Sequence, residues 1–270
     1  MTQREKAERL LALHRAPEIL VLPNAWDAAT AKLFERLGAA AIATTSAPIA
    51  WSLGRPDGEA ISRDEMIAVV ERIARAVGVP VTADLEAGYG DAGATAEAAI
   101  AAGAVGLNLE DGNEDGDDPL VPTEVHAERI KAVREVADRD AVPLVINART
   151  DVFLRQVGKR WDRFDRAVER ANAYLDAGAD CAFLVGVADA ELIRRLVEAI
   201  EGPVSVLARE GSPPITELEQ LGVARVSIGP GLARTALTAA ERAGRELLEG
   251  GTYGFLDGSL ASAELNRLLG

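Results

Sequence analysis

The chain has 270 residues, 48% of them hydrophobic and 4% aromatic, and a formal net charge of −14 with a pI near 4.7. An acidic surface of this kind argues against nucleic acid and against an anionic membrane as the main partner. The length is enough for one large α/β domain with a sizeable core, or for two smaller domains.

Short apolar runs alternate along the chain with amphipathic stretches of helical spacing, after a leading helix over residues 3–14. Strands that are apolar throughout are typical of parallel strands covered on both faces. Ser62, with Glu65 three positions later, is expected to cap the helix that follows it. The predicted strands span residues 18–22, 40–44, 80–84, 105–109, 142–146, 181–185, 203–207 and 224–228. The predicted helices between and after them span residues 28–37, 63–77, 94–102, 123–138, 162–177, 189–200, 215–221 and 232–248.

About eight strand–helix units in a chain of this length indicate a (β/α)8 TIM-type barrel. The alternative is a doubly wound open sheet, which would need a glycine-rich phosphate turn after the first strand. The chain has Pro23-Asn24-Ala25-Trp26 at that place instead. We therefore predict a single barrel domain over residues 1–250. Residues 251–270 are expected to form a loop and a short terminal helix that contacts another subunit.

Carboxylates follow several of the predicted strands, at the end of the barrel where catalytic groups lie. Alternation along a strand would place Asp84 and Glu86 on the same face, and two like charges this close repel each other. Asp57 and Glu110 follow neighbouring strands, so four carboxylates could converge on one region. A hard cation would relieve their repulsion, and all-oxygen ligands favour Mg²⁺ or Mn²⁺ over zinc.

Arg149 is the main cation among these strand ends, and Asn147 precedes it by two positions. Its planar guanidinium can bind a substrate carboxylate with two hydrogen bonds. A metal together with an arginine suits a small dicarboxylate or 2-oxo acid whose enolate must be stabilised. Trp26 could form the floor of a ligand pocket, although core packing explains it equally well.

Few of the remaining reactive side chains point to a function. The one cysteine, Cys181, lies near the start of a strand and is expected to be an inert core thiol. His14 and His126 are expected on solvated helix surfaces. A chain with one cysteine forms no internal disulfide, and its first residues open a charged helix rather than a signal peptide. No apolar run approaches the roughly 18 residues of a membrane span, so we expect a cytoplasmic protein.

Several of these stretches, taken together and in order, resemble the isocitrate lyase/phosphoenolpyruvate mutase superfamily. The resemblance covers roughly residues 15–250. It depends on the combination, because each stretch alone is a weak signal. The stretches are Pro23-Asn24-Ala25-Trp26-Asp27, the Ser46 loop with Leu53-Gly54-Arg55-Pro56-Asp57-Gly58, Asp84-Leu85-Glu86-Ala87-Gly88-Tyr89-Gly90, Asn108-Leu109-Glu110-Asp111 and Ala148-Arg149-Thr150-Asp151.

The resemblance implies a barrel with a swapped last helix, a homotetramer or dimer, a bound Mg²⁺ and a 2-oxo acid enolate intermediate. In that case Asp84 would hold the metal directly or through water, and Arg149 would bind the substrate carboxylate. Ser46 and the amide of Ala47 would contact the enolate oxygen. The residues that would support the metal through waters are Asp57, Glu86 and Glu110. The candidate catalytic residues are therefore Ser46, Glu110 and Arg149, and the candidate substrate contacts are Trp26, Ser46, Ala47, Asn147 and Arg149.

The chain departs from the family where the leaving group would lie. The loop 112–120 has neither the cysteine nor the lysine that the family's lyases or mutases carry there. Val185 or Gly186 stands where the resemblance predicts a glutamate, and Ala208 or Arg209 where it predicts an asparagine. The metal end of the site is kept, and the leaving-group end is changed.

Three functions remain open at this point. The first is a Mg²⁺-dependent lyase, with a hydrolase as a variant, that cleaves a C–C bond in a small 2-hydroxy or 2-oxo diacid. Glu114, His126 or a water would be its acid. The second is a phosphonomutase or P–C bond hydrolase, for which Arg55, Arg149 and Arg209 are the available cations. The third, of another class, is a barrel that binds a 2-oxo acid without turning it over.

Overall fold

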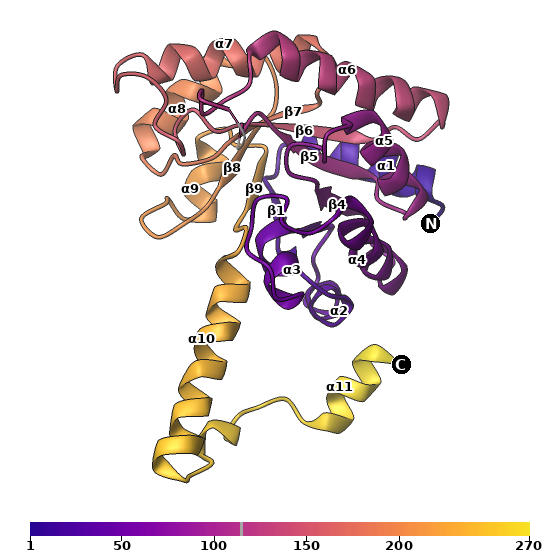
Figure 1. Cartoon of the computed structure of the whole chain (residues 1–270), viewed down its shortest axis with the longest axis vertical. Coiled ribbons are helices and arrows are strands. Elements are labelled where there is room, and N and C mark those ends of the chain that lie inside the picture. The colour runs from indigo at the N-terminus through magenta and orange to yellow at the C-terminus, as the bar shows by residue number, and fades with distance from the viewer. Residues whose placement is uncertain (114–115) are drawn as a thin grey trace.

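Strands run through the centre of the molecule and helices lie outside them (Figure 1). The computed structural model describes residues 1–113 and 116–270. Every strand pair is parallel, as the continuous apolar runs predict. The strands are β1 (Leu20–Leu22), β2 (Asn24–Ala25), β3 (Ile42–Thr44), β4 (Val81–Asp84), β5 (Gly106–Glu110), β6 (Val145–Thr150), β7 (Cys181–Leu184), β8 (Val204–Leu207) and β9 (Arg225–Ser227).

The first predicted strand is divided at Pro23 into β1 and β2, because proline has no N–H to donate to a neighbouring strand. The carbonyl of Pro23 accepts a hydrogen bond from the Ala43 N–H at 3.2 Å. β1 pairs with β9 and β2 pairs with β3, and the full order is β1-β9-β8-β7-β6-β5-β4-β3-β2. β1 and β2 together occupy the position of one barrel strand, between β9 and β3. This confirms the predicted (β/α)8 TIM-type barrel.

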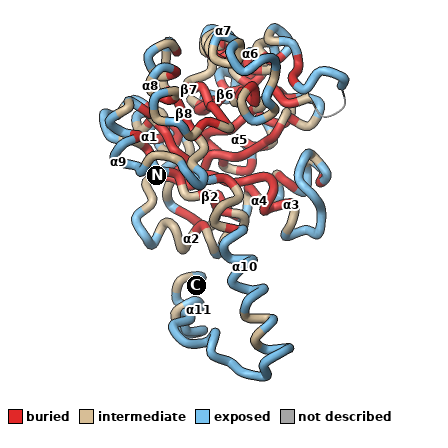
Figure 2. Tube along the Cα trace, turned by 90° about the vertical axis from the view of Figure 1, so that its left-hand side faces the viewer, coloured by how far each residue is buried: buried red, intermediate tan, exposed pale blue. Residues whose placement is uncertain are grey.

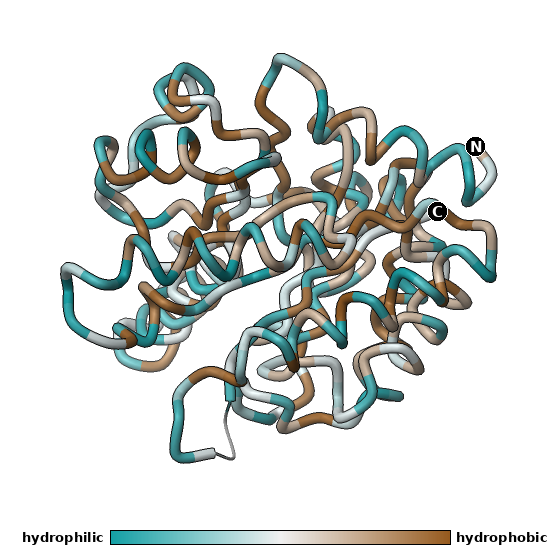
Figure 3. The backbone as a smooth tube through the Cα atoms, turned by 90° about the horizontal axis from the view of Figure 1, so that it is seen from above, coloured by the Kyte–Doolittle hydropathy of each residue, from teal (hydrophilic) through white to brown (hydrophobic). Residues whose placement is uncertain are grey.

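Helices follow the strands on the outside of the barrel, and hydrophilic and hydrophobic stretches alternate along the chain (Figure 3). Residues 46–52 were expected in a loop but form a helix, which tolerates Pro48 in its first turn because the N–H groups there have no partner. No helix in the described part of the chain is long and apolar enough to cross a membrane. The helices are α1 (Gln3–His14), α2 (Ala28–Arg36), α3 (Ser46–Ser52), α4 (Arg63–Ala76), α5 (Ala92–Ala101), α6 (Thr123–Arg139), α7 (Arg163–Asp176), α8 (Ala190–Ala199), α9 (Ile215–Gln220), α10 (Gly231–Arg245), η1 (Glu246–Gly250), η2 (Gly254–Leu256) and α11 (Ser262–Leu269).

The helix ends follow the sequence signals closely. Ser62 forms the predicted capping box: its hydroxyl accepts from the Glu65 N–H at 3.3 Å, and its own N–H donates to Glu65 Oε2 at 2.8 Å. Gly103 ends α5 with a φ of +95°, a conformation that costs other residues more. Such local chemistry fixes the loop lengths that bring each strand end to the barrel mouth.

The C-terminal segment leaves the barrel. α10 stands away from the strands, and Ala233 is its one buried residue (Figures 1 and 2). The chain then turns back, and α11 contacts α2 through an ion pair of 2.9 Å between Arg36 and Glu264. Most of this segment is exposed. A long helix whose apolar face is exposed to solvent is unusual in a soluble monomer.

Candidate active site

Strand register sets three polar side chains side by side in the barrel. Asp84 of β4 pairs with Asn108 of β5, which pairs with Asn147 of β6. The Asn108 amide donates to Asp84 Oδ1 at 3.3 Å and accepts from Asn147 Nδ2 at 2.8 Å. All three residues are buried. Asn147 Oδ1 has no hydrogen-bond partner in the described chain.

Arg225 of β9 joins this row from the opposite side of the barrel and is fully buried. Its Nη2 donates to Asn108 Oδ1 at 3.0 Å, and its Nη1 lies 3.4 Å from His14 Nε2. Burial lowers the pKa of Arg225 to about 10, because an arginine away from water loses hydration of its charge. His14 is therefore a buried partner of this network, and the expectation of a solvated His14 is wrong. His126 is also buried, against Tyr174, because its face of α6 packs inward.

Backbone contacts fix Asp84 from a third direction. The Ser46 N–H donates to Asp84 Oδ2 at 2.9 Å, and the Asp84 N–H donates to Thr44 Oγ1 at 2.8 Å. Buried donors therefore hold both oxygens of the carboxylate. Such hydrogen bonds stabilise its ionised form and fix its orientation. Sequence reasoning did find Ser46 and Asp84, but not their direct contact.

A cavity of about 230 Å³ opens above Asp84 at the carboxyl ends of the strands. Its lining brings together several predicted residues, with Asp57 at the rim and Arg149 on β6. The lining residues are Asn24, Thr45, Ser46, Ala47, Asp57, Asp84, Asn108, Arg149, Leu154, Phe183, Val185, Leu207, Ser227, Gly229 and Pro230. This is the barrel end where active sites of the fold lie.

Glu86 and Glu110 line a neighbouring cavity of about 340 Å³. β4 ends at Asp84, and Glu86 has a left-handed φ of +51°, so the expected shared face of Asp84 and Glu86 is wrong. The turn is held by the Glu59 N–H, which donates to Glu86 Oε2 at 2.6 Å, and by the Tyr89 hydroxyl, which donates to Oε1 at 2.8 Å.

Arg149 lies between the two cavities and is paired on both sides. It forms an ion pair with Glu110, its register partner on β5, and donates from Nε and Nη2 to Asp151 at 2.6 and 2.9 Å. Burial alone would lower the pKa of Arg149, but the charges of Glu110 and Asp151 raise it above its usual value. The guanidinium is therefore charged, fixed in place and largely neutralised by the protein itself.

The carboxylates fit a hydrated cation better than a directly ligated one. In residues 1–113 and 116–270, no group of three or more His, Cys, Asp or Glu side chains is placed to hold a metal ion. Burial and the charge of Asp84 both raise the pKa of Glu86, to about 7, and burial also raises that of Glu110. A cation held partly through water suits such carboxylate oxygens, and Mg²⁺ characteristically keeps several of its waters.

The other predicted residues lie elsewhere. Asn147 is beneath the cavity of Asp84, and Trp26 lines a separate apolar hollow of about 290 Å³ with Trp51. His126 is fully buried and lines neither cavity. Glu114 lies outside the described residues.

Asn108 and Arg225 are two of the site residues whose roles sequence reasoning missed. A signal for Arg225 was present, since a charged residue inside the run Ala224–Ile228 has no place in an apolar strand without a partner. Asp111 is a third: its buried carboxylate accepts from the Tyr174 hydroxyl at 2.8 Å and the Asp151 N–H at 2.9 Å. It thereby fixes the end of β6 that carries Arg149.

The fold and the site define a parallel (β/α)8 barrel with a small, acid-rich cavity at its mouth. The model of the phosphoenolpyruvate phosphomutase family matches residues 10–248. The chain therefore belongs to the phosphoenolpyruvate mutase family, within the isocitrate lyase/phosphoenolpyruvate mutase superfamily.

Relatives with known names agree with this assignment. The chain is 32% identical over 286 residues to 2-methylisocitrate lyase of Aeropyrum pernix, covering 99% of this chain and 89% of that one. A crystal structure from Burkholderia cenocepacia J2315 superposes with a TM-score of 0.91 at 38% identity, covering 98% and 95% of the two chains. Oxaloacetate acetylhydrolase in complex with the product oxalate gives a TM-score of 0.88 at 27% identity, covering 98% and 94%. Named members of the superfamily are lyases or mutases, and the chain is an enzyme of that kind.

Proposed function

We propose that the protein is a Mg²⁺-dependent lyase that cleaves a C–C bond in a small 2-hydroxy or 2-oxo carboxylic acid through an enolate. The observation that carries the proposal is Asp84, whose carboxylate is held by the Ser46 N–H at 2.9 Å and faces one cavity with Asp57 and Arg149. Mn²⁺ is an equivalent cofactor on the same ligand chemistry. The metal would supply Lewis-acid stabilisation of the enolate charge.

The protein's own groups divide the remaining work. Asp84 would hold the cation, with Asp57, Glu86 and Glu110 contacting its waters. Arg149 would orient the substrate carboxylate, and its pairing with Asp151 keeps the guanidinium plane fixed. Ser46 and Ala47 line the same cavity and would contact the enolate oxygen.

Oxalate binding tests this proposal, because oxalate mimics a chelated pyruvate enolate and is the product bound to one structural relative. We expect calorimetric titration to show tight binding that needs both Mg²⁺ and Asp84. Asp84→Ala should abolish it, whereas Asp138→Ala, at an exposed position of α6, should bind as the wild type does. Oxalate that binds equally well without Mg²⁺, or not at all, would contradict the proposal. Release of a 2-oxo acid from candidate substrates would then separate a lyase from a barrel that binds without turnover.

The phosphonomutase alternative has less support from the site. Transfer of a phosphoryl group needs cations, but Arg55 and Arg209 are exposed and do not line the cavity. Arg209 instead donates to the Gly186 carbonyl at 3.0 Å.

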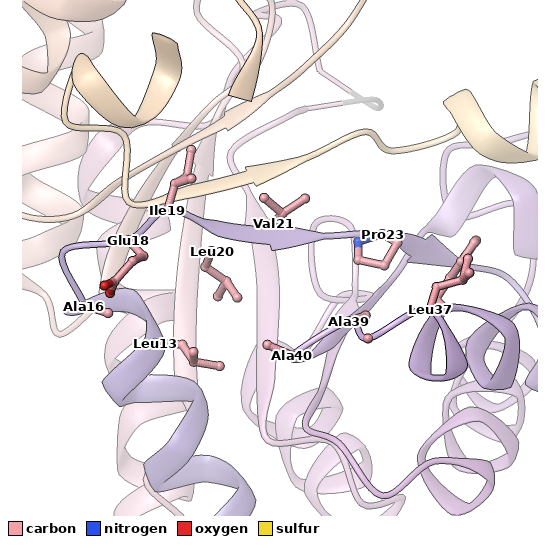
Figure 4. Close-up of a pocket in the computed structure, with 12 residues that line it drawn as sticks. Leu13, Ala16, Glu18, Ile19, Leu20, Val21, Pro23, Leu37, Ala39 and Ala40 are labelled. Atoms are coloured by element: carbon pink, nitrogen blue, oxygen red, sulfur yellow. The ribbon is translucent and has the colours of Figure 1, made fainter. Parts of the chain in front are cut away.

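We also propose that α10 covers the barrel of a second copy, giving a dimer or tetramer with exchanged helices. Leu237, Ala240, Gly244 and Leu247 recur every three or four residues and form an apolar stripe that its own barrel leaves uncovered. An apolar hollow of about 550 Å³ lies over the outer face of β1, where the helix after β9 would otherwise pack. Figure 4 shows Leu13 and Leu20 beside this hollow, and Val21 is 45% exposed.

The oligomer proposal is tested by sedimentation. Leu237→Lys should lower the assembly state, while Ile215→Lys, also exposed but on α9, should leave it unchanged. A wild-type monomer would refute it. The single buried thiol, Cys181, suits the reducing cytoplasm in which we propose that the enzyme works.

A further inference from the structure

The mouth cavity is polar on one side and apolar on the other, and the division follows the order of the strands. Asn24, Ser46, Asp84, Asn108 and Arg149 reach it from consecutive positions around the barrel, on or just after β2, β3, β4, β5 and β6. The next two strands, β7 and β8, contribute apolar side chains instead. The apolar side consists of Phe183, Val185 and Leu207, with Leu154 from the loop after β6 and Pro230 from the loop after β9.

The apolar side begins directly beside the candidate carboxylate-binding group. Phe183 of β7 is the register partner of Arg149 of β6 and is 3% exposed. Phe183, Val185 and Leu207 therefore form the wall that lies beyond Arg149 for a substrate held by Arg149 and Asp84. These side chains offer no hydrogen-bond donor to a second charged group.

The residues described around the cavity include no spare positive charge. Arg149 is the one cation among the described residues that line it, and it already donates to Asp151 and contacts Glu110. A second carboxylate on the substrate would meet Phe183 and Leu207 with only the neutral hydroxyl of Ser227, the register partner of Leu207, beside them. A charge that loses water without gaining a partner binds poorly.

We infer that the substrate is a 2-oxo monocarboxylate with a hydroxyl on C4 and a short alkyl or aryl group beyond it, not a second carboxylate or a phosphono group. When the C3–C4 bond breaks, its electron pair stays on the 2-oxo acid as the enolate, and C4 leaves as an aldehyde after its hydroxyl gives a proton to water. The enolate then takes a proton from water at C3. This substrate assignment rests on the proposed function, because it places the carboxylate and enolate oxygens on the polar side. The cavity of about 230 Å³ limits the size of the apolar group. That volume corresponds to about eight waters, so the ligand has few carbons beyond its polar end.

Two oxamates with the same number of heavy atoms in the tail test the inference. N-isobutyloxamate and N-oxalylglycine share the oxamate end and the N–CH₂ group, and end in an isopropyl group or a carboxylate. Titrated into the wild type with Mg²⁺, the isobutyl compound should bind at least about tenfold more tightly. Leu207→Arg should remove or reverse this ratio, because it offers the tail carboxylate a partner. Ile215→Arg, which changes the net charge equally from an exposed position of α9, should not alter it.

The outcomes separate the two proposals. Failure of oxalate to bind refutes the proposed function itself. If oxalate binds and N-oxalylglycine is preferred, or neither oxamate binds, the apolar-tail assignment is overturned while the enolate site stands. A preference that vanishes at high salt would also overturn it, since repulsion by the protein's overall charge is screened and contact with Phe183 and Leu207 is not.

Discussion

Asn108 is the central connection of the polar network beneath the site, and replacing it with leucine should strongly destabilise the protein. Its Oδ1 accepts from Asn147 Nδ2 at 2.8 Å and from Arg225 Nη2 at 3.0 Å, and its Nδ2 donates to Asp84 at 3.3 Å. Leucine is similar in size but can make none of these bonds. The side chain is 6% exposed, so water has little room to replace them.

The expected loss follows from the groups left without partners. Asn147 and Arg225 each lose a buried hydrogen bond, and each buried donor left unsatisfied costs about 1–3 kcal/mol, with the charged group at the upper end. The long bond to Asp84 adds little, because Ser46 still donates to that carboxylate. Asn108→Leu should therefore lower the free energy of unfolding by about 4 kcal/mol.

Urea denaturation followed by circular dichroism measures this loss. Asn172→Leu is the matched control, since Asn172 is half-buried, accepts from the Glu201 N–H at 2.9 Å and makes only a long bond of 3.4 Å to the Ala199 carbonyl besides. It should cost about 1 kcal/mol. If Asn108→Leu costs no more than the control, the network does not stabilise the barrel as argued.

Two further predictions concern stability. Burial, and then the charge of Arg225, lowers the pKa of His14 from 6.5 to about 4, so below pH 6.5 the unfolded chain takes up a proton that the folded chain does not. Lowering the pH from 7 to 5 should reduce the free energy of unfolding by about 2 kcal/mol through this group. His14→Gln should remove that part of the pH dependence. An unchanged slope of unfolding free energy against pH in the variant would contradict the prediction. Gly186→Ala would set a Cβ 2.6 Å from the Leu154 nitrogen, while Gly211→Ala, also at positive φ, meets no atom within 4 Å. Gly186→Ala should lower the free energy of unfolding by at least about 1 kcal/mol more than Gly211→Ala, measured by thermal or urea unfolding. Equal losses would show that the loop at Leu154 moves aside without cost.

The barrel could be predicted from sequence because its signals are local. Apolar runs, the Ser62 capping box and glycines such as Gly103 each act within a few residues of themselves. The division of the first strand at Pro23 was harder to foresee, because it depends on which neighbour each half pairs with. β1 bonds to β9, some 200 residues later in the chain, and β2 bonds to β3.

The site was predictable in its residue types but not in its connections. Asp84, Arg149 and Ser46 could be located because the fold places strand ends together. The left-handed turn at Glu86, which moves its carboxylate into the neighbouring cavity, depends on Glu59 from a loop 27 positions earlier. No periodicity encodes a contact of that kind.

The buried network gives a physical reason why the carboxylate half of the site can persist while the opposite half varies. Asp84 is tied through Asn108 to Asn147 and Arg225, so a change at any of these disturbs the barrel core as well as the site. Val185 and Leu207 contribute apolar surface, which other apolar residues of similar volume can supply at small cost. Selection for a new substrate can therefore act on β7 and β8 with little effect on stability, whereas the polar side is constrained by folding itself.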